Sequence, residues 1–216
     1  MRRIICALAF LCAAPAVAQQ TPVSTGAAAA TPAAATALIT AASAQDLFEA
    51  LPSDAQVVVR HTRSGLTCRL RSSWQNRIII FPDAARGEDI ACESTNGSAT
   101  IRLYATRYSF HTTLDQQISG AVAAIRQTAP DAHDYAPTVA QSFPGLPATR
   151  SAAFLLTRAS DHTQMYSHVS IAMVSGWVYV MRYTAPAADA AAAHQSEVAA
   201  HTLWQSTLGE VASGHL

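Results

Sequence analysis

The stretch "MYSHVSIAMVSGWVYVMRYT", residues 165–184, decides the fold because it predicts a long antiparallel hairpin. Residues 165–174 and 177–184 are rich in β-branched and aromatic side chains, which favour strands. Between them stands Ser175-Gly176, a pair that suits a two-residue hairpin turn. The register set by this turn predicts four cross-strand pairs: Val174 with Trp177, Ala172 with Tyr179, Ser170 with Met181, and His168 with Tyr183.

This register gives the hairpin two chemically different faces, since side chains alternate along a strand. One face is wholly apolar and should lie against the core; it carries Ile171, Met173, Val178 and Val180. The other face collects aromatic and polar side chains: Trp177, Tyr179, His168 and Tyr183.

Two interpretations of the aromatic face stay open. In the first, the C-terminal helix lies on it with Trp204, as in a sandwich with helices on both sides. In the second, part of the face is exposed and binds a ligand or partner. Trp177 and Tyr179 would then be the anchors, with His168 and Arg182 near the edge.

The rest of the domain alternates between strand and helix patterns. Strands are predicted at 56–62, 66–71, 77–82, 136–143 and 150–160, and Asn96-Gly97 predicts a type I′ hairpin turn. Thr113 and Gln116 form a capping box at the start of one amphipathic helix. A second helix should follow Pro186 and stop at Gly209. This order predicts an α+β fold, an antiparallel sheet with amphipathic helices packed on it.

The order of elements resembles the PsbP-like α/β/α sandwich family. The segments that carry the resemblance are "TIRLYATRYS" and "GWVYVMRYTAP", which stand before the final amphipathic helix. The resemblance covers about 56–208 and implies a fold whose members are mostly non-catalytic binding or assembly factors in oxidising or lumenal compartments. It supplies no site residue.

The N-terminus predicts export. Arg2 and Arg3 precede a short apolar run and then Ala16-Val17-Ala18, the pattern of a signal peptide, residues 1–18, cleaved after Ala18. The run is too short for a transmembrane span. Residues 19–44 are rich in Ala, Thr and Pro and predict a disordered tether before a single domain, 45–212, and a tail, 213–216. The basic residues are all arginine and alanine is abundant, which is typical of high-GC bacteria, so the sequence indicates a bacterial periplasm.

Two cysteines, Cys68 and Cys92, remain after signal cleavage, and they predict a structural disulfide. An even pair in an exported chain is typical of one bond. They do not form a CxxC redox motif, and no lysine stands near to lower a thiol pKa.

Catalytic and metal motifs are weak. His194, Glu197 and His201 share one helix side, but the two histidines are about 10 Å apart along the axis, too far to share one ion. There is no G-x-S-x-G elbow and no phosphate loop. An acidic cluster, Asp83, Glu88, Asp89 and Glu93, is interpreted as the solvated tip of a hairpin.

The sequence therefore predicts a non-catalytic binding or accessory protein with no cofactor. The 14 basic and 14 acidic residues balance, which gives no electrostatic footprint for nucleic acid. Two alternatives stay open: an envelope hydrolase whose site is assembled from distant residues, and a subunit of an envelope complex. An enzyme should show converging titratable groups in a pocket, whereas a binding protein should show an exposed aromatic patch.

Overall fold

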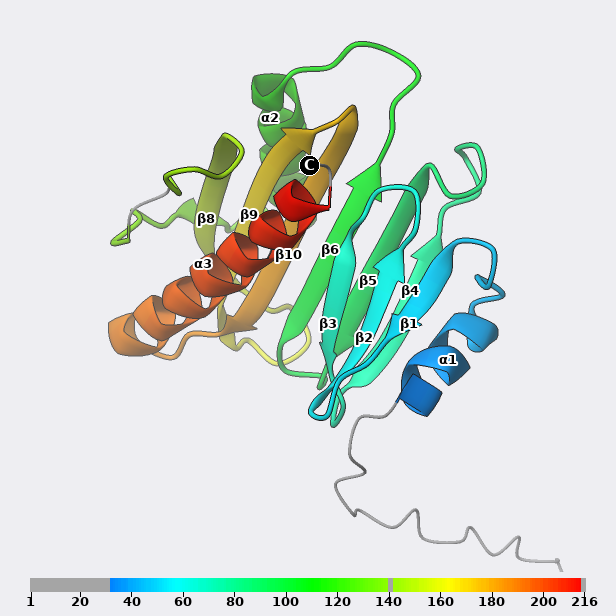
Figure 1. Cartoon of the computed structure of the whole chain (residues 1–216). Helices are drawn as coiled ribbons and strands as arrows, with labels where there is room; N and C mark the ends of the chain where they lie inside the picture. Colours follow the sequence, from blue (N-terminus) through cyan, green and yellow to red (C-terminus); the bar gives the residue numbers. More distant parts are fainter. Residues whose placement is uncertain (1–31, 140–141, 215–216) are drawn as a thin grey trace, which may run out of the picture.

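The computed structural model describes residues 32–139 and 142–214, and it shows an α+β protein with two antiparallel sheets and three helices (Figure 1). The elements follow in this order: α1 (Pro32–Ala41), β1 (Phe48–Leu51), β2 (Gln56–His61), β3 (Thr67–Arg71), β4 (Gln75–Ile80), β5 (Asp89–Thr95), β6 (Thr100–Thr106), α2 (Leu114–Thr128), β7 (His133–Asp134), β8 (Thr149–Thr157), β9 (Gln164–Val174), β10 (Trp177–Pro186) and α3 (Ala190–Ser213). The large sheet has the order β4-β5-β6-β10-β9-β8-β7, and the small sheet the order β1-β2-β3. The predicted fold class is therefore confirmed.

The 165–184 hairpin forms the middle of the large sheet with the predicted register. Trp177 pairs with Val174, Tyr179 with Ala172, Met181 with Ser170 and Tyr183 with His168. Ser175 and Gly176 both have positive φ, 51° and 80°, as a type I′ turn requires. The turn pair thus fixes which side chains of β9 and β10 share each face of the sheet.

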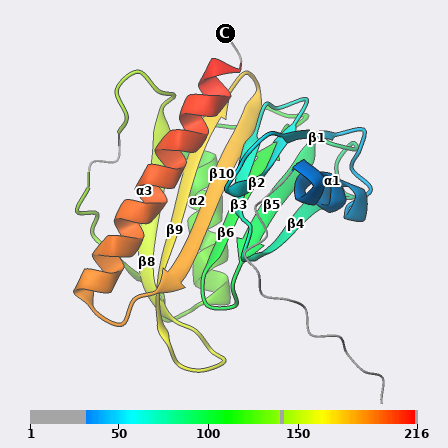
Figure 2. The same cartoon turned by 60° about the horizontal axis from the view of Figure 1, so that its bottom comes forward.

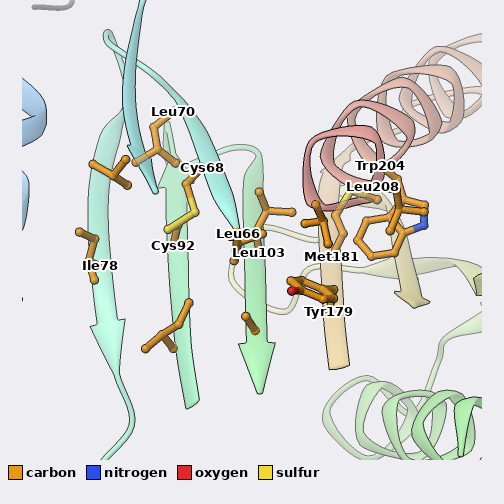
Figure 3. Packing of buried hydrophobic residues seen from close by; sticks show 14 of the residues in the cluster. Leu66, Cys68, Leu70, Ile78, Cys92, Leu103, Tyr179, Met181, Trp204 and Leu208 are labelled. Atoms are coloured by element: carbon orange, nitrogen blue, oxygen red, sulfur yellow. A yellow bond between two sulfur atoms is a disulfide. The ribbon is translucent and has the colours of Figure 1, made fainter. Parts of the chain in front are cut away.

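One face of the large sheet is covered over most of its strands. The small sheet lies over β4, β5 and β6, while α3 lies over β9 and β10 (Figures 1 and 2). In Figure 3, the disulfide between Cys68 of β3 and Cys92 of β5 joins the two sheets, and Met181 lies beneath Trp204 of α3. All four of these side chains are buried, so this layer holds the main hydrophobic core.

The opposite face of the large sheet is only partly covered. Helix α2 packs on β8 and β9 there and forms a second, smaller core around Ile125, Phe154 and Val178. The capping box predicted at Thr113 and Gln116 is present and begins this helix. In the described residues no second layer of helix or strand lies on the same face of β4, β5 and β6 (Figures 1 and 2). Half of the sheet is therefore open on the α2 side.

The disordered tether predicted for residues 19–44 is wrong in its second half. Residues 32–41 form α1, which packs on β1, β2 and β4, and Ala35, Ile39 and Ala44 are buried. Two buried side chains on one side of the helix, Ala35 and Ile39, suffice to order this segment, because alanine has the highest helix propensity. The domain therefore includes residues 32–44, ahead of the start predicted at 45. Residues 1–31, with the predicted signal peptide, lie outside the described residues.

Replacing Ile39 with alanine is expected to lower the free energy of unfolding by about 2 kcal/mol, the lower end of the range for a buried isoleucine. Urea denaturation measures this change. Thr40→Ala on the exposed side of the same helix is the matched control and should stay within about 0.5 kcal/mol of the parent protein. Equal stabilities of the parent and Ile39→Ala would restore the tether prediction.

Three local predictions also need correction. Of the strand predicted at 136–143, the described residues 136–139 and 142–143 form no strand; the structure instead has a short strand, β7, just before this segment, at His133–Asp134. The helix α3 continues through Gly209 to Ser213, because Leu208 and Val211 extend its buried side. Asn96 does not take the positive φ of a type I′ turn. Its side chain instead accepts hydrogen bonds from the backbone N–H groups of Ser98 (3.0 Å) and Ala99 (2.8 Å), which builds a longer loop.

Candidate functional site

The aromatic face of the hairpin is covered, so the binding site predicted there is wrong. Trp177 is 3% exposed, Tyr179 0% and His168 3%. The hydroxyl of Tyr179 donates to the backbone oxygen of Ser64 in the turn between β2 and β3, and Tyr183 is half-buried against the main core. The interpretation in which α3 covers this face is correct for the part of the face near β9. The rest of the face is covered by the small sheet, whose position was not predicted from the sequence.

His168 belongs to a buried polar network under α3. Its Nδ1 lies 3.0 Å from the hydroxyl of Tyr166, and its Nε2 lies 2.7 Å from Oγ of Ser170. Oγ of Ser151 lies 2.7 Å beyond, on β8. Burial lowers the pKa of His168 to about 4. The pair of Ser170 and His168 looks like a nucleophile and its base, but both are buried, so we assign it a structural role.

The helix cluster of His194, Glu197 and His201 is also structural. Glu197 is buried and accepts hydrogen bonds from the backbone N–H groups of Thr138 (2.7 Å) and Val139 (3.2 Å). Burial alone would raise the pKa of Glu197, but these hydrogen bonds lower it. The ring of His201 packs against that of Phe143 in a tilted arrangement, with centroids 4.4 Å apart and an interplanar angle of 37°. In the described part of the chain, no three His, Cys, Asp or Glu side chains come together to hold a metal ion.

The fifth predicted residue, Arg182, lies on the other face of the sheet and lines a groove. Strand alternation places Arg182 with Val180 and Val178, on the side of α2. Between α2 and the open half of the sheet lies a groove of about 470 Å³. Its walls come from β5, β6, β9, β10, the first half of α2 and the segments beside them: Phe81, Asp89, Tyr104, Thr106, Tyr108, Gln116, Gln117, Gly120, Ala121, Ile171, Val180 and Arg182. The volume is in the range of pockets that hold small ligands.

Aromatic side chains form one wall of this groove. The rings of Phe81 and Tyr104 stack with centroids 6.2 Å apart and an interplanar angle of 17°. Tyr108 lies at one end, 5.1 Å from the ring of Phe110, and these two rings are 36% and 64% exposed. Exposed, mutually packed aromatic rings are enriched at sites that bind partners or ligands.

The polar groups of the groove are mostly engaged with one another. Asp89 accepts a hydrogen bond of 2.8 Å from the hydroxyl of Thr106. Burial raises the pKa of Asp89, against the effect of this hydrogen bond. The hydroxyl of Tyr108 donates to Gln117, whose amide in turn donates to Thr112. These contacts hold the lining in place.

Beside the groove, Glu93 is clamped between two arginines. It is 6% exposed, Arg77 Nε lies 2.6 Å from one carboxylate oxygen, and Arg102 Nε lies 2.6 Å from the other. Burial alone would raise the pKa of Glu93, but the two guanidinium groups hold it below its ordinary value. The prediction that the acidic cluster solvates a hairpin tip is therefore wrong for Glu93, which is buried in the middle of β5. The other three residues do lie at the tip of the β4–β5 hairpin: Asp83 and Glu88 in its loop, and Asp89 at the first position of β5.

The sequence contained a signal for this surface. In residues 101–106, the alternating positions Arg102, Tyr104 and Thr106 are polar or amphipathic, while Leu103 and Ala105 between them are apolar. Period-two alternation indicates a strand with one face toward the core and one toward solvent. The position of Phe81 and α2 beside this strand depends on tertiary packing and could not be read from the pattern.

No protein-family model matches the chain, and no curated protein matches its sequence. None of the helices in residues 32–139 and 142–214 combines the length and the hydropathy that a membrane span requires. The disulfide between Cys68 and Cys92 is consistent with an oxidising compartment.

Proposed function

We propose that this chain is an exported, non-catalytic binding or accessory protein of the bacterial periplasm, and that the groove beside α2 is its ligand site. The observation that carries the proposal is the aromatic wall of Phe81 and Tyr104 in an open groove of about 470 Å³. Ligand pockets of this size combine apolar walls with a few polar groups that orient the ligand.

The lining supports binding better than catalysis. The groove offers rings, amides and hydroxyls, and its single carboxylate, Asp89, is engaged by Thr106. Serine or threonine hydroxyl groups lie beside a histidine in the described residues, in the pairs Ser170–His168, Ser64–His61 and Thr138–His194, and none of these residues lines the groove. The resemblance to the PsbP-like family, carried by element order, agrees with a binding role and stays a prediction.

The export part of the proposal rests on the N-terminal sequence and on the disulfide. A chain recovered from the periplasmic fraction should begin at Gln19, and N-terminal sequencing or intact mass measurement checks this. A chain that keeps Arg2 and Arg3 and stays in the cytoplasm would refute export.

The binding part predicts that small aromatic compounds enter the groove. With 3-phenylpropionamide as a neutral probe, amide chemical shifts in a titration should change at Tyr104, Ala121 and Val180. Tyr104→Ala should weaken binding by about fivefold, since a ring–ring contact contributes roughly 0.5–1.5 kcal/mol.

Two variants control this experiment. Tyr104→Phe keeps the ring and should keep most of the affinity. Trp74→Ala removes an aromatic ring at the β3–β4 turn, where it packs on Arg71, and should leave the titration unchanged. Shifts scattered over the whole surface, or a Tyr104→Ala variant that binds as the parent does, would overturn the groove as the site.

A further inference from the structure

A row of four charged side chains crosses the open half of the large sheet. The strand registers pair Arg77 with Glu93, Glu93 with Arg102, and Arg102 with Arg182, on β4, β5, β6 and β10. Directly paired residues of antiparallel strands share a face, and Glu93 and Arg182 both lie on the α2 side. The row therefore runs along the surface beside the aromatic wall and ends at Arg182 in the groove.

The row carries more positive than negative charge. Glu93 is its single acid, and Arg77 and Arg102 both form ion pairs with it. A further N–H group of Arg102 donates to the hydroxyl of Tyr104. In residues 32–139 and 142–214, no hydrogen bond or ion pair engages the guanidinium group of Arg182.

The pairing of Arg102 with Arg182 is unfavourable by itself. Like charges directly opposite each other on neighbouring strands destabilise a sheet. Glu93 offsets part of this repulsion through its ion pair with Arg102. The other two nearby carboxylates are engaged elsewhere: Asp89 accepts from Thr106, and Asp115 at the start of α2 is paired with Arg150 at 2.8 Å. A bound anion at Arg182 would offset this repulsion.

We propose that the groove binds a small organic carboxylate in which the carboxylate group adjoins a flat, ring-containing body. This inference rests on the proposed function and specifies its ligand class. The guanidinium of Arg182 would take the carboxylate, since its planar fork matches two carboxylate oxygens. The body of the ligand would lie on the wall of Phe81 and Tyr104.

The charge balance favours a carboxylate over a phosphate ester. Arg102 is already shared with Glu93 and Tyr104, which leaves one unpaired guanidinium in the groove. Among the described residues of the groove, the one guanidinium group that is free to bind, Arg182, matches one carboxylate, whereas a phosphate monoester carries nearly two negative charges at pH 7 and is usually held by several donors.

Three probes with the same ring test this: 3-phenylpropionate, 3-phenylpropionamide and phenyl phosphate, each titrated into the protein at low salt and followed by amide chemical shifts. The parent protein should bind the carboxylate about tenfold more tightly than the amide, because hydrogen bonds to charged groups are stronger than neutral ones. Arg182→Gln should remove this preference while still binding the amide. The carboxylate preference should also weaken with added salt.

Arg60→Gln is the matched control. It removes one arginine from the exposed pair with Glu49 on the small sheet and should keep the tenfold preference. Equal affinity of the parent for carboxylate and amide at the groove would overturn the carboxylate assignment and leave the proposed function standing. Tighter binding of phenyl phosphate than of 3-phenylpropionate would overturn it in favour of a phosphate ligand. Absence of groove shifts with all three probes would remove both proposals.

Discussion

Replacing Cys68 and Cys92 together with alanine is expected to lower the free energy of unfolding by about 4 kcal/mol. The bond closes a loop with a sequence separation of 24, and loop closure of this length stabilises by about 3.5 kcal/mol in the chain-entropy model. The rest comes from packing, because both sulfur atoms are buried between the two sheets (Figure 3). Typical domains are stable by 5–15 kcal/mol, so this variant should be close to unfolding.

Urea denaturation with and without a reductant measures this effect. When a strong reductant cleaves the disulfide in the unfolded state, the free energy of unfolding of the parent protein should fall by a similar amount. The free energy of unfolding of the double variant should not change with reductant. A double variant within about 1 kcal/mol of the parent would contradict the structural role of the bond.

The same variant should keep its groove. Cys92 points toward the small sheet, while its neighbours Ala91 and Glu93 point to the α2 side. The shifts induced by 3-phenylpropionate at temperatures where the variant is folded should therefore match those of the parent. A loss of binding in folded protein would show that the bond shapes the ligand site.

The sequence predicted those features that depend on local chemistry. The Ser175-Gly176 turn fixed the register of the central hairpin, and the capping box at Thr113 marked the start of α2. The two cysteines predicted their bond, because few partners were available. In each case, residues close in the sequence, or a very small set of candidates, determined the outcome.

Features that depend on the order of strands in space could not be predicted in this way. On the side away from β9, β10 pairs with β6, which lies some seventy residues earlier in the sequence. This pairing brings Arg102 beside Arg182. The small sheet covers Tyr179 because β3 is bonded to β5, not because of any pattern in the hairpin itself. The sequence therefore identified both faces of the hairpin but placed the binding site on the wrong one.

Acidification from pH 7 to pH 5 is expected to lower the free energy of unfolding by about 4 kcal/mol through two buried histidines. Burial lowers the pKa of His61 and of His168 to about 4, from an ordinary value of 6.5. Below pH 6.5 the unfolded chain takes up a proton at each site, while the folded protein stays neutral until about pH 4. The unfolded state then binds about two more protons, so stability falls as the pH falls through this window.

The surroundings of both rings explain why protonation is unfavourable. His61 lies between the rings of Phe48 and Trp177, and its Nδ1 accepts from the backbone N–H of Ser64 at 3.3 Å, which a protonated nitrogen cannot do. Its Nε2 is buried and has no hydrogen-bond partner among the described residues. His168 is held by two neutral hydroxyls, those of Tyr166 and Ser170. Among the described residues, the hydrogen-bond partners of the two rings are hydroxyls and a backbone N–H group, not carboxylates. The charge of Glu197 raises the pKa of His168, but burial outweighs this effect.

The slope of the free energy of unfolding against pH, between pH 5 and 6.5, reports the protons taken up by the two histidines on unfolding. A loss of packing alone would lower stability without changing this slope. Urea denaturation of the parent should approach a slope of about 2.7 kcal/mol per pH unit, the value for two protons. His61→Asn and His168→Asn should each reduce the slope by about half, whatever their absolute stability. His133→Asn, at an exposed position, should leave the slope unchanged. A parent protein whose stability is flat across this window would show that both rings are charged or accessible in the folded state, and would overturn the burial of the hairpin's aromatic face.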